Sequence, residues 1–250
     1  MDNFDEYLTE YLKAHDIEVV YEDIDNVSED EYVNIRMDWL GASDSSKLLD
    51  VNPFPNGSCS DLIYEKVNCV NDPEISKKAS VRMGKDVEHI ILSKLQQYFF
   101  LDTIKKPKDM YGNLRNHLGV NFDAVYFDPL DIEHPVPFEI KTVTKYGRKY
   151  YDFSKSTYYQ KDGEWQSQRE VSNDESKEAI PIYYYTQLQQ QMLFLRSEYG
   201  YLAVLDADNW DVHIFKINAD HALWEELETK AFKVWNQILI SRKIKENKKA

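Results

Sequence analysis

The chain has 250 residues, 42% of them hydrophobic, and a formal net charge of -14. This length suits one compact α/β domain with insertions, and the composition is typical of a globular protein rather than a disordered one. No apolar run approaches the roughly 20 residues that cross a bilayer, and the acidic start lacks the features of a secretory signal, so we expect a cytoplasmic protein that is not bound to a membrane.

The negative charge is concentrated near the N-terminus. Residues 1–34 hold 12 acidic residues against one basic residue, Lys13, a balance of -11 that leaves -3 for the remaining 216 residues. The overall acidity therefore argues only weakly against a nucleic-acid partner, whose phosphates need a basic surface.

The N-terminal part of the chain is predicted to contain two helices. An acidic amphipathic helix is expected over about 2–14, followed by a linker to Tyr32. A short helix should start near Ser43 or Asp44, which are both good N-caps, and the NPFPNG stretch over 52–57 should end it.

A longer helix and two strands are predicted in the middle of the chain. The helix is expected over about 73–98, and the strands over 119–127 and 137–144. We expect the two strands to be neighbours in one sheet.

The C-terminal part combines two helices with two strands. A helix over about 181–196, with Pro181 in its first turn, is followed by strands near 199–206 and 211–217. A final helix is expected over about 219–241, where apolar residues recur at helical spacing. The alternation of helices and strands indicates an α/β fold.

A basic, tyrosine-rich segment lies between Ile140 and Lys161. It has six basic residues and one acidic residue, interleaved with five tyrosines. These residues are Lys141, Lys145, Arg148, Lys149, Lys155, Lys161, Asp152, Tyr146, Tyr150, Tyr151, Tyr158 and Tyr159. Cations and aromatic rings in this pattern suit phosphates and stacked bases, and a solvated loop is the alternative interpretation.

The chemistry is predicted to lie on the two central strands. Because alternate residues of a strand point to the same side, Glu139 and Lys141 should project together, away from Phe138 and Ile140. Asp123 interrupts an apolar strand, where a carboxylate must be paired, hydrogen-bonded or bound to a cation. Two converging carboxylates repel, and Mg²⁺ relieves that repulsion and retains water as a nucleophile. An ordinary salt bridge between Glu139 and Lys141 is the alternative.

Two helices add polar residues to apolar stripes. On the 73–98 helix, Glu88 shares a face with apolar residues, and Gly84 one turn earlier is expected to allow a close approach to the sheet. On the 181–196 helix, Gln187 and Gln191 share a face with leucines, where an amide can orient a water or a phosphate oxygen. A solvent-facing Glu88 and buried amides bonded to backbone are the alternatives.

Together these residues resemble the pattern of the phage lambda exonuclease and YqaJ-type viral recombinase family, within the PD-(D/E)xK nuclease superfamily. The resemblance covers most of residues 36–206 in five short blocks in the family's order. They are RMDWLGASDSSKLL (36–49) with Arg36 and Ser43, GKDVE (84–88), Asp123, Glu139-Ile140-Lys141, and YYTQLQQQM (184–192) with Gln187. The chain departs from the family in lacking the proline and glycine around Asp123, in the long interval to Glu139, and in having Asn121 at a position that is a hydroxyl residue in some relatives.

The resemblance implies a restriction-endonuclease-like core, a central mixed β-sheet flanked by helices, with the nuclease domain over 35–241. Residues 1–34 would then be an acidic extension and 242–250 a basic tail. It also implies an exonuclease that digests one strand of linear double-stranded DNA from the 5′ end and leaves 3′ overhangs for recombination. Relatives of this kind are often trimers that work with a single-strand annealing protein, so the resemblance implies a homo-oligomer that acts at double-stranded DNA ends.

The resemblance assigns roles to individual residues. Asp123, Glu139 and the Ile140 carbonyl would ligate Mg²⁺, and Glu88 would support a second ion, with Mn²⁺ as a substitute metal. Lys141 would orient and help deprotonate the attacking water, and Gln187 would steady the site. Arg36 and Ser43 would hold the 5′-phosphate of the DNA end.

Two other functions stay open at this point. A structure-selective or restriction-type endonuclease could use the same core, because a fold and a metal site do not fix how DNA enters. A noncatalytic acidic DNA mimic or inhibitor could be built on residues 1–34. An iron–sulfur nuclease is disfavoured because Cys59 and Cys69 are too few for a four-thiolate cluster, and we expect no disulfide between them.

Overall fold

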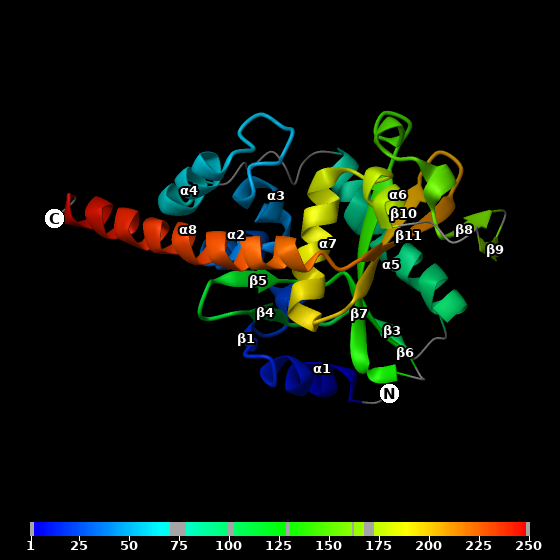
Figure 1. Ribbon diagram of the computed structural model, residues 1–250, viewed down its shortest axis with the longest axis horizontal. Coiled ribbons are helices and arrows are strands. Elements are labelled where there is room, and N and C mark those ends of the chain that lie inside the picture. The colour runs from blue at the N-terminus through cyan, green and yellow to red at the C-terminus, as the bar shows by residue number, and fades with distance from the viewer. Residues whose placement is uncertain are drawn as a thin grey trace. The chain divides into compact units, whose positions relative to one another are not determined.

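The computed structural model describes residues 3–70, 79–99, 103–128, 131–161, 163–167 and 173–248. Their helices and strands are labelled in Figure 1. The chain divides into two compact units. Unit 1 comprises Met1–Phe4, Pro73–Pro107 and Phe122–Ala219, and unit 2 comprises Asp5–Asp72, Lys108–Asn121 and Asp220–Ala250.

Unit 1 contains a seven-stranded mixed sheet. The strands, in the order in which they are bonded, are β3 (Ile104–Lys105), β6 (Ala124–Asp128), β7 (Asp131–Val143), β10 (Tyr199–Asp206), β11 (Asp211–Asn218), β8 (Tyr158–Lys161) and β9 (Glu164–Ser167). Strands β7 and β10 are parallel, and the other neighbouring pairs are antiparallel. The described helices of the unit are α5 (Ala79–Phe99), α6 (Asn173–Glu178) and α7 (Ile182–Leu195), with short 3-10 turns η3 (Arg148–Tyr150) and η4 (Phe153–Lys155).

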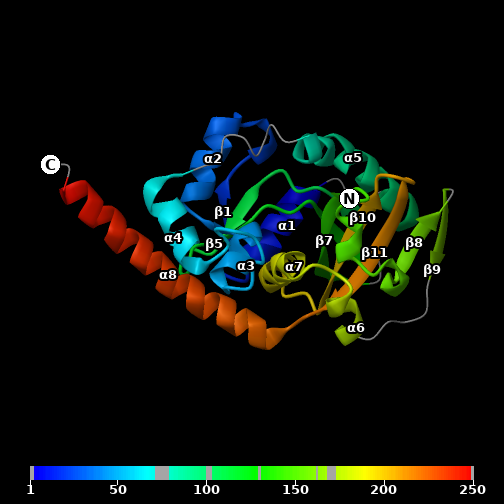
Figure 2. The same cartoon turned by 90° about the horizontal axis from the view of Figure 1, so that it is seen from above.

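Helices α5 and α7 pack on opposite faces of this sheet, as Figure 2 shows. Val87, Ile91 and Leu95 of α5 form one apolar core with Phe138 and Ile140 of β7. Because side chains alternate along a strand, Glu139 and Lys141 of β7 face the α7 side of the sheet. The structure therefore confirms the prediction that Glu139 and Lys141 project from one face of the strand, and Phe138 and Ile140 from the other.

Unit 2 contains a four-stranded sheet and the remaining helices. The strands in bonded order are β1 (Glu18–Tyr21), β4 (Met110–Gly112), β5 (Leu118–Val120) and β2 (Leu40–Gly41). The helices are α1 (Phe4–Lys13), α2 (Glu29–Met37), α3 (Ser45–Leu48), α4 (Cys59–Asn68) and α8 (His221–Asn247), with 3-10 turns η1 (Ile24–Asn26) and η2 (Ala42–Asp44).

The predicted linker between the first helix and Tyr32 is wrong. That stretch contains β1, which pairs antiparallel with β4, then η1 and the start of α2. Ile17 and Ile24 are buried and give this short segment an apolar side that can pack. Helix α4 was also not expected, although Ser58 and Asp61 form a capping box at its start.

The predicted strand over 119–127 is two strands. Residues up to Val120 belong to β5 of the four-stranded sheet, whereas residues from Ala124 onward belong to β6 and pair with β7. Asp123 lies in the bend between them rather than inside a strand. At this bend the chain passes from the four-stranded sheet to the seven-stranded sheet. The apolar pattern of the sequence continues across the bend and therefore does not indicate it.

The other predicted elements agree with the structure in type. The two strands of the hairpin β10–β11, helix α7 and the neighbouring positions of β6 and β7 are confirmed. The predicted start of the 73–98 helix lies outside the described residues. Helix α8 continues to Asn247, past the predicted end at 241, and Arg242 on it donates to the backbone oxygens of Met37 and Lys66. Among the described helices, none has the length and apolar character needed to cross a bilayer.

We predict that Leu95→Ala lowers the free energy of unfolding by about 2–5 kcal/mol, because Leu95 is fully buried in the core beneath β7 and its loss leaves a cavity. Urea denaturation would measure the change. Gln97→Ala, an exposed position on the same helix, is the matched control and should change stability by less than about 0.5 kcal/mol. Equal effects of the two substitutions would contradict this account of the core.

Candidate active site

Glu139 is a carboxylate with no exposed surface, in the middle of β7. Its Oε1 accepts a hydrogen bond from Gln187 Nε2 at 2.5 Å, and its Oε2 accepts one from Gln191 Nε2 at 2.5 Å. The Lys141 ammonium forms an ion pair with Oε1. A buried charge is tolerated only with partners of this kind, and both glutamines come from α7 on the facing side of the sheet.

Asp123 joins the same group from the bend before β6. Its Oδ2 lies 3.7 Å from Lys141 Nζ and accepts a hydrogen bond from the Ile140 backbone N–H at 2.8 Å. The structure therefore brings Asp123, Glu139 and Lys141 together, as the sequence predicts. With Gln187 and Gln191 they form what we call the Glu139 cluster.

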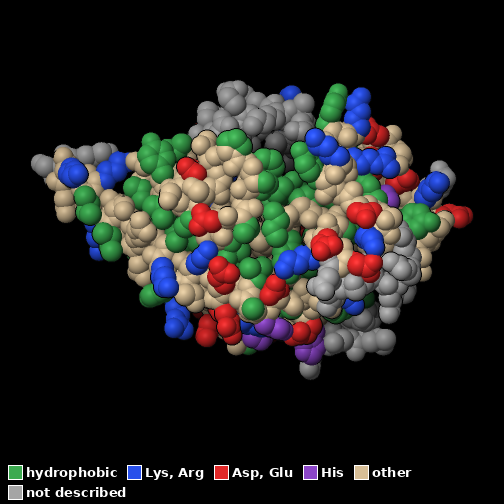
Figure 3. All heavy atoms as spheres, turned by 45° about the horizontal axis from the view of Figure 1, so that its top comes forward, with side chains coloured by type: hydrophobic (Ala, Val, Ile, Leu, Met, Phe, Trp, Pro, Cys, Tyr) green, Lys and Arg blue, Asp and Glu red, His purple; other side chains and the backbone are tan. Residues whose placement is uncertain are grey.

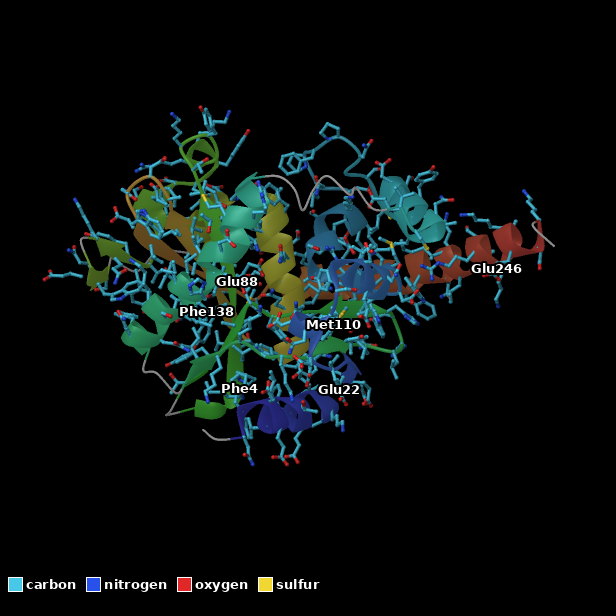
Figure 4. The ribbon with its side chains drawn as sticks, turned by 180° about the vertical axis from the view of Figure 1, so that it is seen from behind. Phe4, Glu22, Glu88, Met110, Phe138 and Glu246 are labelled. Carbon is cyan, nitrogen blue, oxygen red and sulfur yellow. The ribbon has the colours of Figure 1, made fainter. Side chains whose placement is uncertain are left out.

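Glu88 lies on α5, one position after the buried Val87, and is labelled in Figure 4. Its carboxylate pairs with Lys106 Nζ at 3.1 Å, and 28% of its side chain is exposed. Burial raises the pKa of Glu88, and the charge of Asp123 raises it further. The predicted role of Gly84 is wrong, because a Cβ added there would meet no described atom within 4 Å.

The sequence did not predict the partners of two residues of the site. Gln191 was expected on the same helical face as Gln187 but not as a donor to Glu139, although the spacing of one turn was the signal that both amides reach one point. No pattern in the sequence indicated the role of Lys106. It follows the two-residue strand β3 and reaches Glu88 only because α5 packs on the sheet.

The charges in the Glu139 cluster shift one another. Burial raises the pKa of Glu139 from its ordinary 4.5 to about 7, with Asp123 adding to the effect and Lys141 opposing it. Burial alone would lower the pKa of Lys141, but the charges of Glu139 and Asp123 outweigh it and raise that pKa. These shifts favour the ammonium form of Lys141 and the protonated form of Glu139.

The donor set fits a hard divalent cation. The charge of Asp123 raises the pKa of both Glu88 and Glu139, so Asp123 repels each of them, and carboxylate oxygens are the ligands that Mg²⁺ prefers. Lys141 supplies the positive charge between two of them. Within the described ranges, no three His, Cys, Asp or Glu side chains are close enough to enclose an ion by themselves.

Arg36 and Ser43 lie in unit 2, and they touch. Arg36 Nη2 donates to Ser43 Oγ at 2.8 Å and lies 3.6 Å from Asp44 Oδ1. Asp44 is nearly buried and is held mainly by Lys66 Nζ at 2.8 Å and by the Gly41 backbone N–H at 3.0 Å. Lys66 already balances the charge of Asp44, so the Arg36 guanidinium has N–H donors left for an anion. The Arg36 side chain is 38% exposed.

Comparisons with known proteins identify a family for the chain. The family model of the YqaJ-like viral recombinase domain matches residues 31–194. Among curated proteins, no sequence matches this chain.

Two solved structures share the fold. The crystal structure of LHK-Exo, an alkaline exonuclease from Laribacter hongkongensis, has 15% identity and a TM-score of 0.59, covering 88% of this chain and 97% of its own. LHK-Exo in complex with dAMP has 14% identity and a TM-score of 0.61, with the same coverage. These matches confirm the expected α/β PD-(D/E)xK fold class, with a central mixed sheet flanked by helices.

The raised pKa of Glu139 predicts a pH dependence of stability in EDTA. A carboxyl whose pKa is higher in the folded state stabilises the fold below about pH 4.5, and this contribution is lost as the pH rises through about 7. Wild type should therefore lose up to roughly 3 kcal/mol relative to Glu139→Gln over that window, since the variant does not titrate. Urea unfolding of both proteins at several pH values measures it, and parallel curves would contradict the shift.

Proposed function

Since this chain belongs to the YqaJ-like viral recombinase domain family, we propose that it is a metal-dependent exonuclease acting on linear double-stranded DNA. In this proposal it digests one strand from the 5′ end and leaves 3′ overhangs for phage-type recombination. The observation that carries the proposal is the Glu139 cluster, in which a buried carboxylate, a second carboxylate and a lysine meet at the centre of a sheet. The domain division into 1–34, 35–241 and 242–250 remains part of it.

The carboxylates would hold the metal. Asp123, Glu139 and the Ile140 carbonyl would ligate Mg²⁺, for which Mn²⁺ would substitute, and Glu88 would support a second ion. When bound, two such ions activate water and stabilise the charge on the attacking and leaving oxygens of a phosphodiester. The mutual repulsion of the carboxylates is the feature of this site that supports the assignment.

The remaining polar residues would prepare the site. Gln187 and Gln191 fix both oxygens of Glu139, so that its carboxylate cannot rotate. Lys141 would donate a hydrogen bond to the attacking water and orient it. Taking a proton from that water requires the neutral amine, and a neighbouring cation favours that form.

Arg36 and Ser43 would recognise the end of the DNA. Their hydrogen-bonded pair offers a guanidinium fork and a hydroxyl, which suit a terminal phosphate dianion. A homo-oligomer, a trimer by resemblance to the family, and a single-strand annealing protein as partner complete the proposal.

Linear and covalently closed circular duplex DNA, each with Mg²⁺ and with EDTA, would separate the candidate functions. The proposal expects digestion of the linear form alone, with Mg²⁺ alone. Nicking of closed circles would support a structure-selective or restriction-type endonuclease, which the same metal-site chemistry would also allow. The absence of cleavage under every condition would support a noncatalytic DNA mimic or inhibitor.

We predict that Asp123→Asn and Lys141→Ala each reduce the rate on linear duplex at least about 100-fold, because each removes a charge that the chemistry needs. Lys243→Ala, an exposed lysine on α8, is the control and should keep full activity. Circular dichroism would check that the variants are folded. Near-normal digestion by either folded variant would exclude the assignment of the metal site.

The proposed contact of Arg36 and Ser43 with the DNA end predicts a preference for 5′-phosphorylated DNA. Removing the 5′-phosphate should slow wild type on the order of tenfold or more, because one charge-assisted contact contributes roughly 1.5 to 3 kcal/mol. Arg36→Ala should be slow on phosphorylated ends and indifferent to dephosphorylation, since both changes delete the same interaction. Equal wild-type rates on 5′-hydroxyl and 5′-phosphate ends would refute the phosphate-binding role of Arg36 and Ser43 and the 5′-to-3′ direction.

A further inference from the structure

A cationic, aromatic loop follows the strand that carries Glu139 and Lys141. Strand β7 ends at Val143, and residues 145–150 are Lys-Tyr-Gly-Arg-Lys-Tyr, with three cations, two tyrosines and no acid. We call them the 145–150 loop. Tyr146 is 77% exposed and Tyr150 is 58% exposed, although burying large aromatic rings is normally favourable. The proposed catalytic roles use none of these residues.

The loop is held in a defined conformation. The Gly147 and Arg148 backbone N–H groups donate to the Thr144 carbonyl at 2.9 and 3.0 Å. The Tyr150 N–H donates to the Gly147 carbonyl at 3.0 Å, and Arg148 Nη1 lies 3.0 Å from the fully buried Asp206 at the end of β10. The exposed rings are therefore carried by a backbone that is fastened to the sheet.

Each exposed ring has a cation beside it. Lys145 Nζ lies 5.2 Å from the centre of the Tyr146 ring, and Lys149 Nζ lies 5.0 Å from that of Tyr150. Both lysines are exposed. In Figure 3, basic and hydrophobic side chains protrude together at the upper right, on the side where the green loop between β7 and β8 stands at the top of Figure 1. Two such pairs offer two aromatic surfaces and two phosphate contacts.

A row of tyrosines connects this loop to Lys141. Burial, then Tyr184 and Tyr150, raise the pKa of Tyr183 to about 12, which places Tyr150 near it. The Tyr183 and Tyr184 rings are 4.4 Å apart, and Lys141 Nζ is 5.4 Å from the Tyr184 ring. Contacts therefore lead from Tyr183 through Tyr184 to Lys141 of the Glu139 cluster, in the same unit as the loop.

We propose that the 145–150 loop is a binding site for single-stranded DNA, in which Tyr146 and Tyr150 stack on unpaired bases while Lys145 and Lys149 contact the phosphates. The inference rests on the proposed function, because it names the part of the DNA that this side of the site holds. Single-stranded DNA is favoured over duplex because only unpaired bases expose their faces to an aromatic ring, whereas a duplex would engage the lysines alone.

Fluorescence anisotropy with a labelled thymidine 12-mer and with a blunt duplex tests the proposal. All variants are made in full-length Asp123→Asn protein and measured in EDTA, so that no cleavage occurs. Tyr146→Ala/Tyr150→Ala should raise the Kd for the single strand at least about tenfold and the Kd for duplex less than about twofold, since stacking is lost only from the former. Tyr146→Phe/Tyr150→Phe should bind like the parent, because both rings remain.

Two further variants complete the test. Lys145→Ala/Lys149→Ala should weaken single-strand binding and lower its salt slope by roughly 1.4, the value for two phosphate contacts. Tyr64→Ala removes a tyrosine that is 63% exposed on α4 and should change nothing. Equal weakening of both DNA forms by the double tyrosine variant, or binding that is unchanged in it, would overturn the proposal.

Binding and cleavage are scored separately, so the two proposals can fail separately. If wild type digests linear duplex but the tyrosine variants bind single strands normally, only the loop site is excluded. If wild type digests no DNA but the tyrosines are needed for single-strand binding, the loop site stands and the exonuclease proposal fails.

Discussion

The structure depends on one costly placement, a glutamate with no exposed surface in the middle of the central sheet. Removing the Glu139 carboxylate from water is unfavourable, and the cost is offset only by several strong donors held in position. The donors come from two elements, Lys141 on β7 itself and the two glutamines one turn apart on α7. The same contacts therefore fix the position of α7 on the sheet and the orientation of the carboxylate, so fold and site share one constraint.

The opposite face of β7 makes this arrangement possible. Phe138 and Ile140 enter the apolar core beneath α5, which fixes the register of the strand, because a shift by one residue would bury Lys141 among apolar side chains. The backbone of Ile140 also donates to Asp123, so the second carboxylate is positioned by the strand that carries the first. The charge of Asp123 raises the pKa of both Glu88 and Glu139, and a divalent cation would relieve this repulsion.

Patterns with a fixed period could be predicted from the sequence, and features set by tertiary packing could not. The alternation of apolar and charged residues in the PFEIK segment (137–141) predicted that Glu139 and Lys141 lie on one side of the strand. Helical spacing predicted that Gln187 and Gln191 lie on one face of their helix, as observed. The bend at Asp123 was missed because the apolar run continues across it while the chain passes from one sheet to another. The close approach expected at Gly84 does not occur, and the partner of Glu88, Lys106, comes from a segment whose position depends on how α5 packs.

Strand β7 connects the proposed metal site to the proposed single-strand site. It contributes a core residue, a buried carboxylate and a lysine within four positions, and two residues beyond its end the chain forms the 145–150 loop. Because a strand advances about 3.3 Å per residue and the loop is fastened through Thr144 and Asp206, the distance between the exposed rings and the Glu139 cluster is set by covalent geometry and few hydrogen bonds. An unpaired strand stacked on those rings would lie at a constant spacing from the carboxylates. A fixed spacing of this kind suits an enzyme that must repeat one cut at each successive nucleotide, since every step then returns the next phosphodiester to the same place.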